Sequence, residues 1–394
     1  MHIPTGGSIG GASGGAASNA HMRALADVFR SFARRECRGS SPLYERLALG
    51  VAEDPALLEM VLELSTASRP GQPVPNLLLG AVHALLLRGV RHPLAAYFPD
   101  LVAPPAQALG DPMPAFAAFC AQHRAALGTL LATQLVQTNE VRRCACLLPA
   151  FALAARLARG RPLALIEIGA SAGLNLLWDH YAFDYGMAGQ IGHADATVRL
   201  TCAVRGPRLP LVPRTMPLVG WRLGIDLHPV DVQDPDAVAW LRALIWPEHR
   251  ERSATLDAAI AIARQTPPRL LAGDALELLT DALEAAPAEA LVCVYHSFTL
   301  NQFAPVERRR WRTLLAKVGR RRELCQISLE YRLGHAAPQP TLAFSHSRPG
   351  ALDEPERALA ICHPHGAWIA WRSAEGRRRR HARNVERDVD RPEA

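Results

Sequence analysis

From about residue 161 onward, short apolar runs alternate with stretches of helical spacing. The apolar runs are LALIEIG, LVGWRLGID, RLLAGD, ALVCVYHS, ELCQISLEY, TLAFSHS and ALAICHPHGAWIAW. Helical patterns such as DAVAWLRALI and VERRRWRTLLAKV separate most of these runs. Strand and helix in alternation predict a parallel sheet with helices on both faces. We therefore expect a doubly wound, mostly parallel, Rossmann-like α/β domain over residues 161–372, with an irregular Pro-rich insertion at about 187–220.

The preceding residues 21–160 follow a different pattern. Apolar residues recur three and four positions apart in segments such as RALADVFRSFARR, PALLEMVLELS and PNLLLGAVHALLLRG. This spacing predicts an all-helical N-terminal domain. His83, inside the apolar AVHALLL, is expected to be a hydrogen-bonded core histidine. We expect residues 1–20, which are Gly-rich, to form a disordered tail, and residues 373–394 to form a charged flexible tail.

The composition narrows the classes of function. With 49% apolar and 21% charged residues among 394, the chain is an ordinary globular protein. Its net charge of +7 comes almost wholly from arginine, and the arginine clusters have no interleaved aromatics, which argues against a nucleic-acid-binding surface. No signal peptide or membrane-spanning run is recognisable, and the eight cysteines fit buried free thiols in a reducing compartment. Cys144 and Cys146 have no second cysteine pair beside them, so we expect no metal site. The lack of a signal peptide and of a membrane-spanning run leads us to expect no membrane association and a cytoplasmic location.

The segment LALIEIGASAGLNLLW allows two interpretations. Read as G-x-S-x-G, it is a nucleophile elbow with Ser171 attacking an ester. Read as E-x-G-x-S-x-G, it is a nucleotide-binding loop, in which the small residues Gly169, Ala170, Ser171 and Gly173 let the backbone approach a ligand. The helical pattern upstream and the lack of an HGG string favour the nucleotide-binding loop, because a hydrolase elbow follows several strands. A helix is expected directly after this loop, with its N-terminus facing the ligand.

Acidic residues end the strands around this loop. Glu167 lies within the first strand, Asp226 ends LVGWRLGID, and Asp274 with Ala275 follows RLLAG. Three carboxylates around one crevice suit a cationic ligand better than a pyrophosphate. This favours S-adenosylmethionine over NAD, although aspartates at such positions are also common as helix caps and turn residues. If VRLTCAV is the second strand instead, Asp195 is the competing acid.

With these motifs, residues 161–372 resemble the class I S-adenosylmethionine-dependent methyltransferases. EIGASAG corresponds to their D-x-G-x-G-x-G loop, GIDLHP to the acidic second strand and GDA to the third. The resemblance implies that Glu167, Gly169, Ala170, Ser171, Gly173, Asp226, Asp274 and Ala275 bind the cofactor. Ser171 replaces the middle glycine of that motif. More residues than usual separate Gly173 from Asp226, so the insertion must be looped out of the domain.

The chain as a whole is more similar to a bacterial family known as domain of unknown function 2332. The segments that carry this likeness include SPLYERLALGVAED, QTNEVRRCACLLP, EIGASAGLNLLWDHY, GIDLHPVDV and WLRALIWPEHRER, and they span 40–330. This family implies no activity, so the mechanism must come from the residues.

Further candidates for chemistry follow the fourth and fifth strands. His296 ends VYH and is a candidate general base, Glu330 ends ELCQISLE, and both are assigned catalytic roles. Ser297, the residue after His296, is expected to bind the substrate. The polar QTNE stretch interrupts an apolar helical pattern, so Asn139 or Glu140 either lines a substrate pocket or lies in a break between two helices.

The leading hypothesis is therefore methyl transfer from S-adenosylmethionine to a small or medium acceptor. A serine esterase is the first alternative, with Ser171, Asp353 and His363 or His365 as its triad. A non-catalytic protein that binds a nucleotide or a partner is the second. The sequence predicts a small-molecule substrate but neither the acceptor nor the oligomeric state.

Overall fold

The computed structural model describes residues 13–102, 108–137, 139–332, 339–350, 355–373 and 377–378. The chain divides into two compact units, which are described separately. Unit 1 comprises Met1–Asn139 and Val230–Ile260, and unit 2 comprises Glu140–Pro229 and Ala261–Ala394. No helix in the described part of the chain is both long and apolar enough to cross a bilayer.

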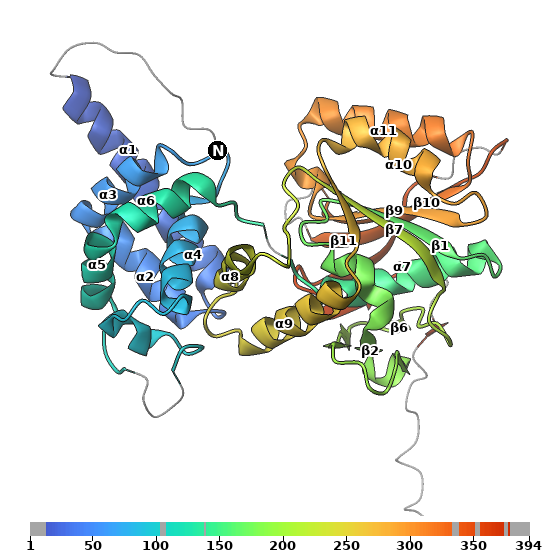
Figure 1. The fold of residues 1–394 in the computed structure, drawn as a ribbon, viewed down its shortest axis with the longest axis horizontal. Helices are drawn as coiled ribbons and strands as arrows, with labels where there is room; N and C mark the ends of the chain where they lie inside the picture. Colours follow the sequence, from blue (N-terminus) through green and yellow to red (C-terminus); the bar gives the residue numbers. More distant parts are fainter. Residues whose placement is uncertain are drawn as a thin grey trace, which may run out of the picture. The chain divides into compact units, whose positions relative to one another are not determined.

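Unit 1 is built from helices in the part of it that the structure describes (Figure 1, blue to teal for the N-terminal helices and yellow for α8). They are α1 (Ser13–Phe32), the π-helix η1 (Ala33–Cys37), α2 (Pro42–Glu53), α3 (Pro55–Ser65), α4 (Val74–Leu87), the 3₁₀ helix η2 (Pro93–Tyr97), α5 (Met113–Gln122), α6 (Arg124–Thr133) and α8 (Pro235–Ala243). Helix α9 (Arg250–Gln265) begins in unit 1 and ends in unit 2. Several of these helices start where a polar side chain caps a free amide and a proline follows, as Asp54 and Pro55 do for α3.

A buried histidine joins three segments of unit 1. His83 of α4 is 1% exposed, and its Nδ1 lies 3.1 Å from the carbonyl oxygen of Ala243 at the end of α8. Its Nε2 lies 2.7 Å from a carboxylate oxygen of Asp100. The expectation of a hydrogen-bonded core histidine is confirmed. The contact with Ala243 ties the segment 230–260 to helices that precede it by more than a hundred residues.

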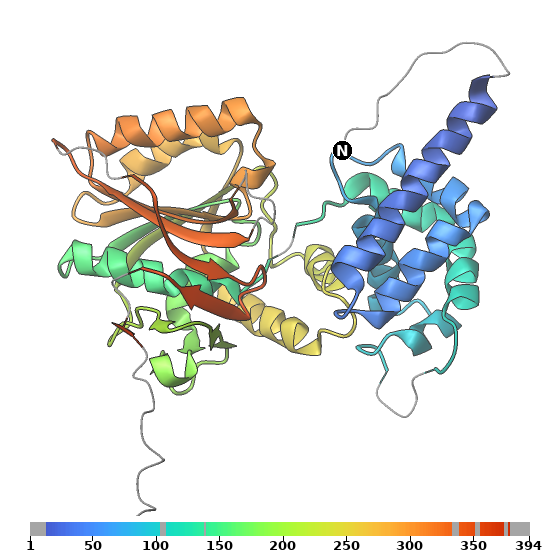
Figure 2. The same cartoon turned by 180° about the vertical axis from the view of Figure 1, so that it is seen from behind.

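Unit 2 is a mixed α/β structure around a nine-stranded sheet with the order β5-β13-β12-β11-β10-β9-β1-β7-β8. The strands are β1 (Leu163–Ile168), β5 (Ala203–Val204), β7 (Val219–Asp226), β8 (Arg269–Ala272), β9 (Leu291–Ser297), β10 (Leu324–Tyr331), β11 (Pro340–Ser347), β12 (Arg357–Cys362) and β13 (Trp368–Trp371). The five strands from β8 to β10 are parallel, and β11, β12 and β13 continue antiparallel. Seen from behind, these C-terminal strands are orange to red (Figure 2). The predicted α/β fold with a large, mostly parallel sheet is confirmed.

Helices cover both faces of this sheet (Figure 1). Helices α10 (Ala275–Ala285) and α11 (Pro305–Gly319) lie on one face, and α7 (Arg143–Ala158) lies on the other. The side chains of Val292 and Val294 on β9 pack with α10 and α11, whereas Tyr295 contacts Phe151 of α7. Side chains therefore alternate between the two faces along β9, as strand geometry requires.

The division into units differs from the expected domain boundary at residue 160. Helix α7, which the sequence pattern groups with the N-terminal helices, packs on β9, β10 and β11 and belongs to unit 2. Gln137, Asn139 and Glu140 of the QTNE stretch lie between α6 and α7, as the interpretation of a break between two helices predicts. Helix α1 begins at Ser13, inside the expected tail, while residues 1–12 and nearly all of 373–394 lie outside the described residues.

The expected insertion at 187–220 contains short strands. A small sheet with the order β3-β2-β4 is formed by β2 (Ala182–Asp184), β3 (Gln190–Ile191) and β4 (Arg199–Thr201), next to the 3₁₀ turn η4 (Gly186–Ala188). Strand β6 (Arg208–Leu209) pairs with β14 (Arg377–Arg378). The strand beside β1 is β7 and not β4, so the acid at that strand tip is Asp226 rather than Asp195.

The segment after the glycine loop is not the expected helix. It is η3 (Leu174–His180), a 3₁₀ helix with a kink at Leu177. The carbonyl of Leu174 accepts the hydroxyl of Tyr181 at 2.6 Å, and that of Leu176 accepts the guanidinium of Arg222 at 3.2 Å. These side chains take the acceptors that an α-helix would offer to its own amides.

Candidate functional site

The glycine loop, residues 169–173, follows β1 with three residues in the left-handed region. Gly169 has φ +73°, Ser171 has φ +49° and Gly173 has φ +69°. A Cβ at position 169 would lie 2.3 Å from the hydroxyl oxygen of Thr299, and one at 173 would lie 2.7 Å from Pro268. Both glycines are therefore required by their backbone conformation and by close packing. Ser171 bears the strain of a left-handed residue with a side chain.

The amides of this loop are bonded within the protein. The N–H groups of Gly169 and Ala170 donate to the carbonyl of Ile225 on β7, at 2.8 and 3.3 Å. The N–H of Ser171 donates to a carboxylate oxygen of Asp226 at 2.8 Å. The last glycine of the loop donates to the carbonyl of Ala170 at 2.7 Å. The loop is thus anchored to the tip of β7 and does not present these four donors to a ligand.

Asp226 holds two backbone segments with its two carboxylate oxygens. One oxygen accepts the N–H of Ser171, and the other accepts the N–H of His228 at 2.8 Å. Its side chain is 8% exposed at the end of β7. The predicted strand-tip acid is at the expected place beside the glycine loop, and its observed contacts define the shape of that loop.

Glu167 is the most strongly perturbed carboxyl at this edge of the sheet. It is 2% exposed on the α7 face of β1, pairs in register with Tyr295 of β9 and accepts the Tyr295 hydroxyl at 3.2 Å. The pKa of Glu167 is raised from its ordinary 4.5 to about 8, and burial is the largest cause of the rise. The nearby charge of Asp226 also acts to raise this pKa, while hydrogen bonds from Tyr295 and Asn175 and the charge of Arg143 act to lower it. A carboxyl in this environment is neutral at pH 7 unless a cation accompanies it.

Sequence reasoning missed Tyr295 and Asn175 as partners of Glu167. Tyr295 immediately precedes the predicted His296, but its pairing with Glu167 depends on the register of β1 against β9. Asn175 is 9% exposed and also accepts the Cys144 thiol at 3.2 Å. The only sequence signal for Asn175 is one polar residue in the apolar run GLNLLW.

Asp274 and Ala275 lie at the start of α10. The Asp274 carboxylate accepts the N–H of Leu276 at 2.8 Å, so it is the N-cap of this helix. Ala275 is the first helical residue and is 6% exposed. The cap interpretation of Asp274 is therefore observed, and a contact with a cofactor stays a prediction.

His296 and Glu330, both predicted as catalytic, contact one another. The Nδ1 of His296 lies 2.8 Å from a carboxylate oxygen of Glu330 on the neighbouring strand β10. His296 is 1% exposed, and its ring stands edge-on to that of Trp311 of α11 with 5.9 Å between the centroids. Its Nε2 has no hydrogen-bond partner among the described residues. His296 thus points to the α11 face, away from Glu167 and Tyr295.

Residues 297–302 form the loop that follows β9, called here the β9 loop. Phe298 in this loop has φ +55°, a strained conformation for a large side chain. Its ring lies edge-on to that of Tyr331 at 5.3 Å, and the guanidinium carbon of Arg143 lies 4.4 Å from its centroid. Strained residues thus follow both β1 and β9, the two central neighbours of the sheet.

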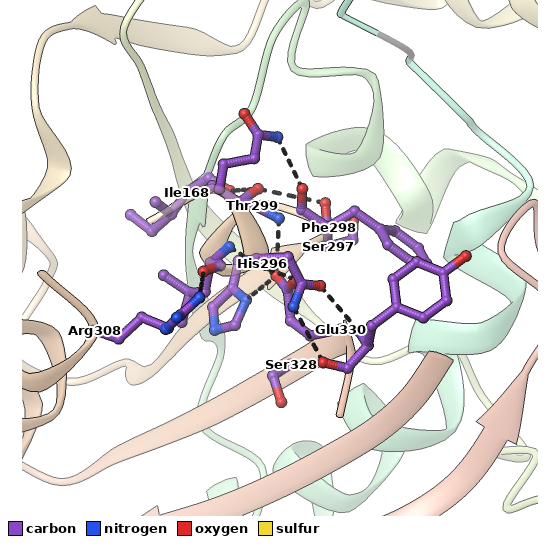
Figure 3. Close-up of polar contacts among 12 residues, drawn as sticks. Ile168, His296, Ser297, Phe298, Thr299, Arg308, Ser328 and Glu330 are labelled. Carbon is purple, nitrogen blue, oxygen red and sulfur yellow. Dashed lines mark hydrogen bonds and ion pairs between the residues drawn. The ribbon is translucent and has the colours of Figure 1, made fainter. Parts of the chain in front are cut away.

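Glu330 collects the amides of the β9 loop (Figure 3). One of its carboxylate oxygens accepts the N–H of Thr299 at 2.8 Å and that of Leu300 at 3.0 Å, and the other accepts the N–H of Asn301 at 3.3 Å. Asn301 also pairs with the backbone of Tyr331, donating to its carbonyl at 3.1 Å and accepting its N–H at 2.9 Å. The 3₁₀ turn η5 (Leu300–Gln302) is thereby fixed to the end of β10.

The same loop contacts the glycine loop through Thr299. The Oγ1 of Thr299 lies 3.1 Å from the carbonyl oxygen of Ile168, the last residue of β1, and 3.3 Å from that of Ser297. Figure 3 shows the contacts that run from Ile168 through Thr299 to Glu330 and His296. The β9 loop therefore connects the tips of β1 and β10.

The residues predicted to bind substrate are Ser297, Asn139 and Glu140, and few of their contacts are observed. Ser297 is the last residue of β9 and contacts Thr299 through its carbonyl. Glu140, in unit 2, is 4% exposed and accepts the N–H of Arg142 at 3.3 Å. Asn139 belongs to unit 1. A contact of these three residues with a substrate stays a prediction.

The predicted esterase triad is only partly described. Ser171 is 7% exposed, and its left-handed backbone is also what a nucleophile elbow requires. His363 accepts the N–H of His365 on its Nδ1 at 3.1 Å, and the two rings are 5.7 Å apart. Asp353, the predicted acid, lies outside the described residues.

Each of the eight cysteines is buried and free. Among the described residues, no group of three or more His, Cys, Asp or Glu side chains has the arrangement of a metal site.

Comparison with protein-family models identifies a bacterial family. The model of the bacterial family DUF2332, described as an uncharacterized protein conserved in bacteria, matches residues 26–371. No curated protein and no solved structure gives a significant match to the chain.

Proposed function

We propose that this chain, which belongs to the DUF2332 family, uses unit 2 to bind S-adenosylmethionine and to transfer its methyl group to a small or medium acceptor. The proposal is carried by one observation. The carboxyls of Glu167 and Asp226, near the ends of the neighbouring strands β1 and β7, interact beside a glycine loop in which four amides are already bonded within the protein.

The order of the parallel strands supports a ligand at this position. The parallel part of the sheet runs β8-β7-β1-β9-β10, so β1, the first of these strands in the chain, lies in the middle. Strands β7 and β8 lie on one side of it, and β9 and β10 lie on the other, as in a doubly wound sheet. The chain leaves β1 toward β7 on one side and later returns to β9 on the other. Ligands of such sheets bind beyond the carboxyl ends of the strands at this reversal. The antiparallel strands β11–β13 depart from this pattern, but they lie away from the reversal.

The charge of the site favours a cation over a phosphate. Phosphate-binding loops offer free backbone N–H groups, whereas Gly169, Ala170 and Ser171 donate theirs to β7. Glu167 and Asp226 lie close enough for the charge of Asp226 to raise the pKa of Glu167. A pyrophosphate would add repulsion to this pair, while a sulfonium or ammonium group would relieve it.

The residues present fit such a ligand with distinct roles. Glu167 is suited to balance a positive charge, and Asp226 holds the glycine loop in its close-packed shape. The bound cofactor supplies an electrophilic methyl group, and the protein contributes by aligning the acceptor with it. His296 lies on the opposite face of the sheet from Glu167, so its buried pair with Glu330 favours a structural role over that of a general base.

Calorimetry with S-adenosylmethionine and S-adenosylhomocysteine tests the proposal. At about pH 7, about 0.9 of the Glu167 carboxyl groups are protonated if the pKa is about 8, so a cation that binds there releases nearly one proton. We expect the binding enthalpy to depend on the ionisation enthalpy of the buffer, and this dependence to vanish in Glu167→Gln. Glu277→Gln, which changes an exposed carboxyl on α10, should retain it. No binding of either ligand at millimolar concentration would exclude the proposal.

The strained backbone at Ser171 keeps the esterase as the second candidate. Hydrolysis of p-nitrophenyl esters by the wild type and its loss in Ser171→Ala would establish that activity. Absent hydrolysis, or hydrolysis unchanged by the substitution, would exclude Ser171 as the nucleophile. Ligand bound to the purified protein, identified by mass spectrometry, distinguishes both enzymes from a non-catalytic binding protein.

A further inference from the structure

The β9 loop is built around a carboxylate that belongs to another strand. Three consecutive amides, those of Thr299, Leu300 and Asn301, converge on Glu330. Consecutive amides of this kind form a concave anion site, and here the protein's own side chain occupies it. His296 adds a fourth donor through Nδ1. Glu330 therefore determines the conformation of the loop, which includes the strained Phe298.

The same loop touches the first residue of the glycine loop. The amide of Thr299 donates to the Glu330 carboxylate, and the hydroxyl of Thr299 donates to the carbonyl of Ile168. The hydroxyl occupies the space that a side chain at position 169 would fill, since a Cβ there would lie 2.3 Å from it. A movement of the Thr299 backbone must therefore displace the hydroxyl from Gly169 and from the end of β1.

From these contacts we infer that Glu330 is a positioning residue for the glycine loop and acts on it through Thr299. Glu330 itself has no observed contact with Gly169 or with the rest of that loop. The consequence for a bound ligand rests on the proposed function, but the coupling between the two loops does not. The role differs from that of a general acid or base, because no proton of Glu330 is moved.

Hydrogen exchange of the ligand-free protein tests the coupling. Glu330→Gln keeps the shape of the side chain but replaces one acceptor oxygen with an NH₂ group that faces a donor. We expect exchange to accelerate by about tenfold in a peptide covering the β9 loop and also in one covering the glycine loop, which corresponds to the loss of one hydrogen bond to a charged group. A peptide from β8 should be unchanged and reports that the unit is folded.

Two further variants separate positioning from a general loss of structure. Thr299→Val keeps the volume of the side chain and removes its hydroxyl, so it should accelerate exchange in the glycine loop while the amides on Glu330 stay protected. Ser328→Ala is the matched control, because Ser328 lies two residues before Glu330 on β10 and donates instead to Glu356 at 2.6 Å. It should leave both loops unchanged.

The outcomes decide the inference without reference to an activity. Two outcomes would overturn the inference. In the first, Glu330→Gln accelerates exchange in the β9 loop while the glycine loop exchanges as in the wild type. In the second, Thr299→Val leaves exchange in the glycine loop unchanged. If Glu330→Gln does not fold, Thr299→Val still decides. Where the wild type binds S-adenosylhomocysteine, both variants should bind it about tenfold more weakly and Ser328→Ala should bind it equally. Failure of the wild type to bind would count against the proposed function alone.

Discussion

Replacing Glu167 with glutamine should make unit 2 more stable at alkaline pH. The side chain is 2% exposed, and burial raises its pKa from 4.5 to about 8. The folded state therefore favours the protonated carboxyl, while the unfolded chain ionises near 4.5. The stability that this preference contributes is fully present below about pH 4.5 and is lost as the pH rises through about 8. Glutamine has the same shape and never ionises.

The size of the effect follows from the shift. Each pKa unit corresponds to about 1.4 kcal/mol, so the rise from 4.5 to about 8 amounts to about 5 kcal/mol at full ionisation. Between about pH 6 and about pH 8.5, the linkage relation gives a change of about 2–3 kcal/mol in the wild type that glutamine lacks. This corresponds to roughly a seventyfold change in the equilibrium for opening.

Hydrogen exchange of β9 measures this change in unit 2 alone. Leu291–Ser297 has the same sequence in the wild type and in Glu167→Gln, so the intrinsic exchange rates cancel at each pH. We expect the ratio of wild-type to variant exchange to rise about seventyfold between about pH 6 and about pH 8.5. The exposed Glu277→Gln should give a constant ratio. A constant ratio for Glu167→Gln as well would refute the perturbed carboxyl and the argument for a cationic ligand built on it.

Three further changes test the packing and the caps. His83→Leu should destabilise unit 1 by about 3 kcal/mol, because it leaves the Asp100 carboxylate without its buried partner, and urea denaturation measures the loss. Asp274→Ala should cost about 1 kcal/mol through the lost cap of α10, and a much larger loss of ligand affinity than of stability would instead indicate a cofactor contact. Gly169→Ala should lower the melting temperature by several degrees, because the new Cβ meets Thr299 at 2.3 Å in a left-handed backbone, and calorimetry measures it.

The sequence predicts the large elements of unit 2 because their patterns are long. Buried parallel strands give continuous apolar runs, and LALIEI, VGWRLGID and LVCVYHS became β1, β7 and β9. The two- and three-residue strands between η3 and β7 have no periodicity to detect, so the small sheet was missed. The helix expected after the glycine loop is instead a kinked 3₁₀ helix, and two of its carbonyls accept side chains, one from Tyr181 directly after it and one from Arg222 on the neighbouring strand β7.

The site was predictable in its position but not in its contacts. The strand pattern places Asp226 beside the glycine loop, as observed. The pairing of Glu167 with Tyr295 depends on the register of two strands more than a hundred residues apart, which no local pattern encodes. The assignment of α7 to unit 2 was missed for a similar reason, because an apolar helix does not show which core it joins.

An acidic residue near the end of a strand can bind a loop of the protein itself or a ligand, and its observed contacts distinguish the two. Asp226 at the end of β7 binds the loop that follows β1, and Glu330 near the end of β10 binds the loop that follows β9. Each of these two loops contains a strained residue, Ser171 or Phe298, whose conformation costs about 1–3 kcal/mol and must be held by its surroundings. Two of the strand-tip acids are thus explained by the loops that they shape. Glu167 binds no backbone amide in the observed contacts and accepts only side-chain donors, so no loop accounts for its burial, and under the proposed function it is the acid that faces the cationic ligand.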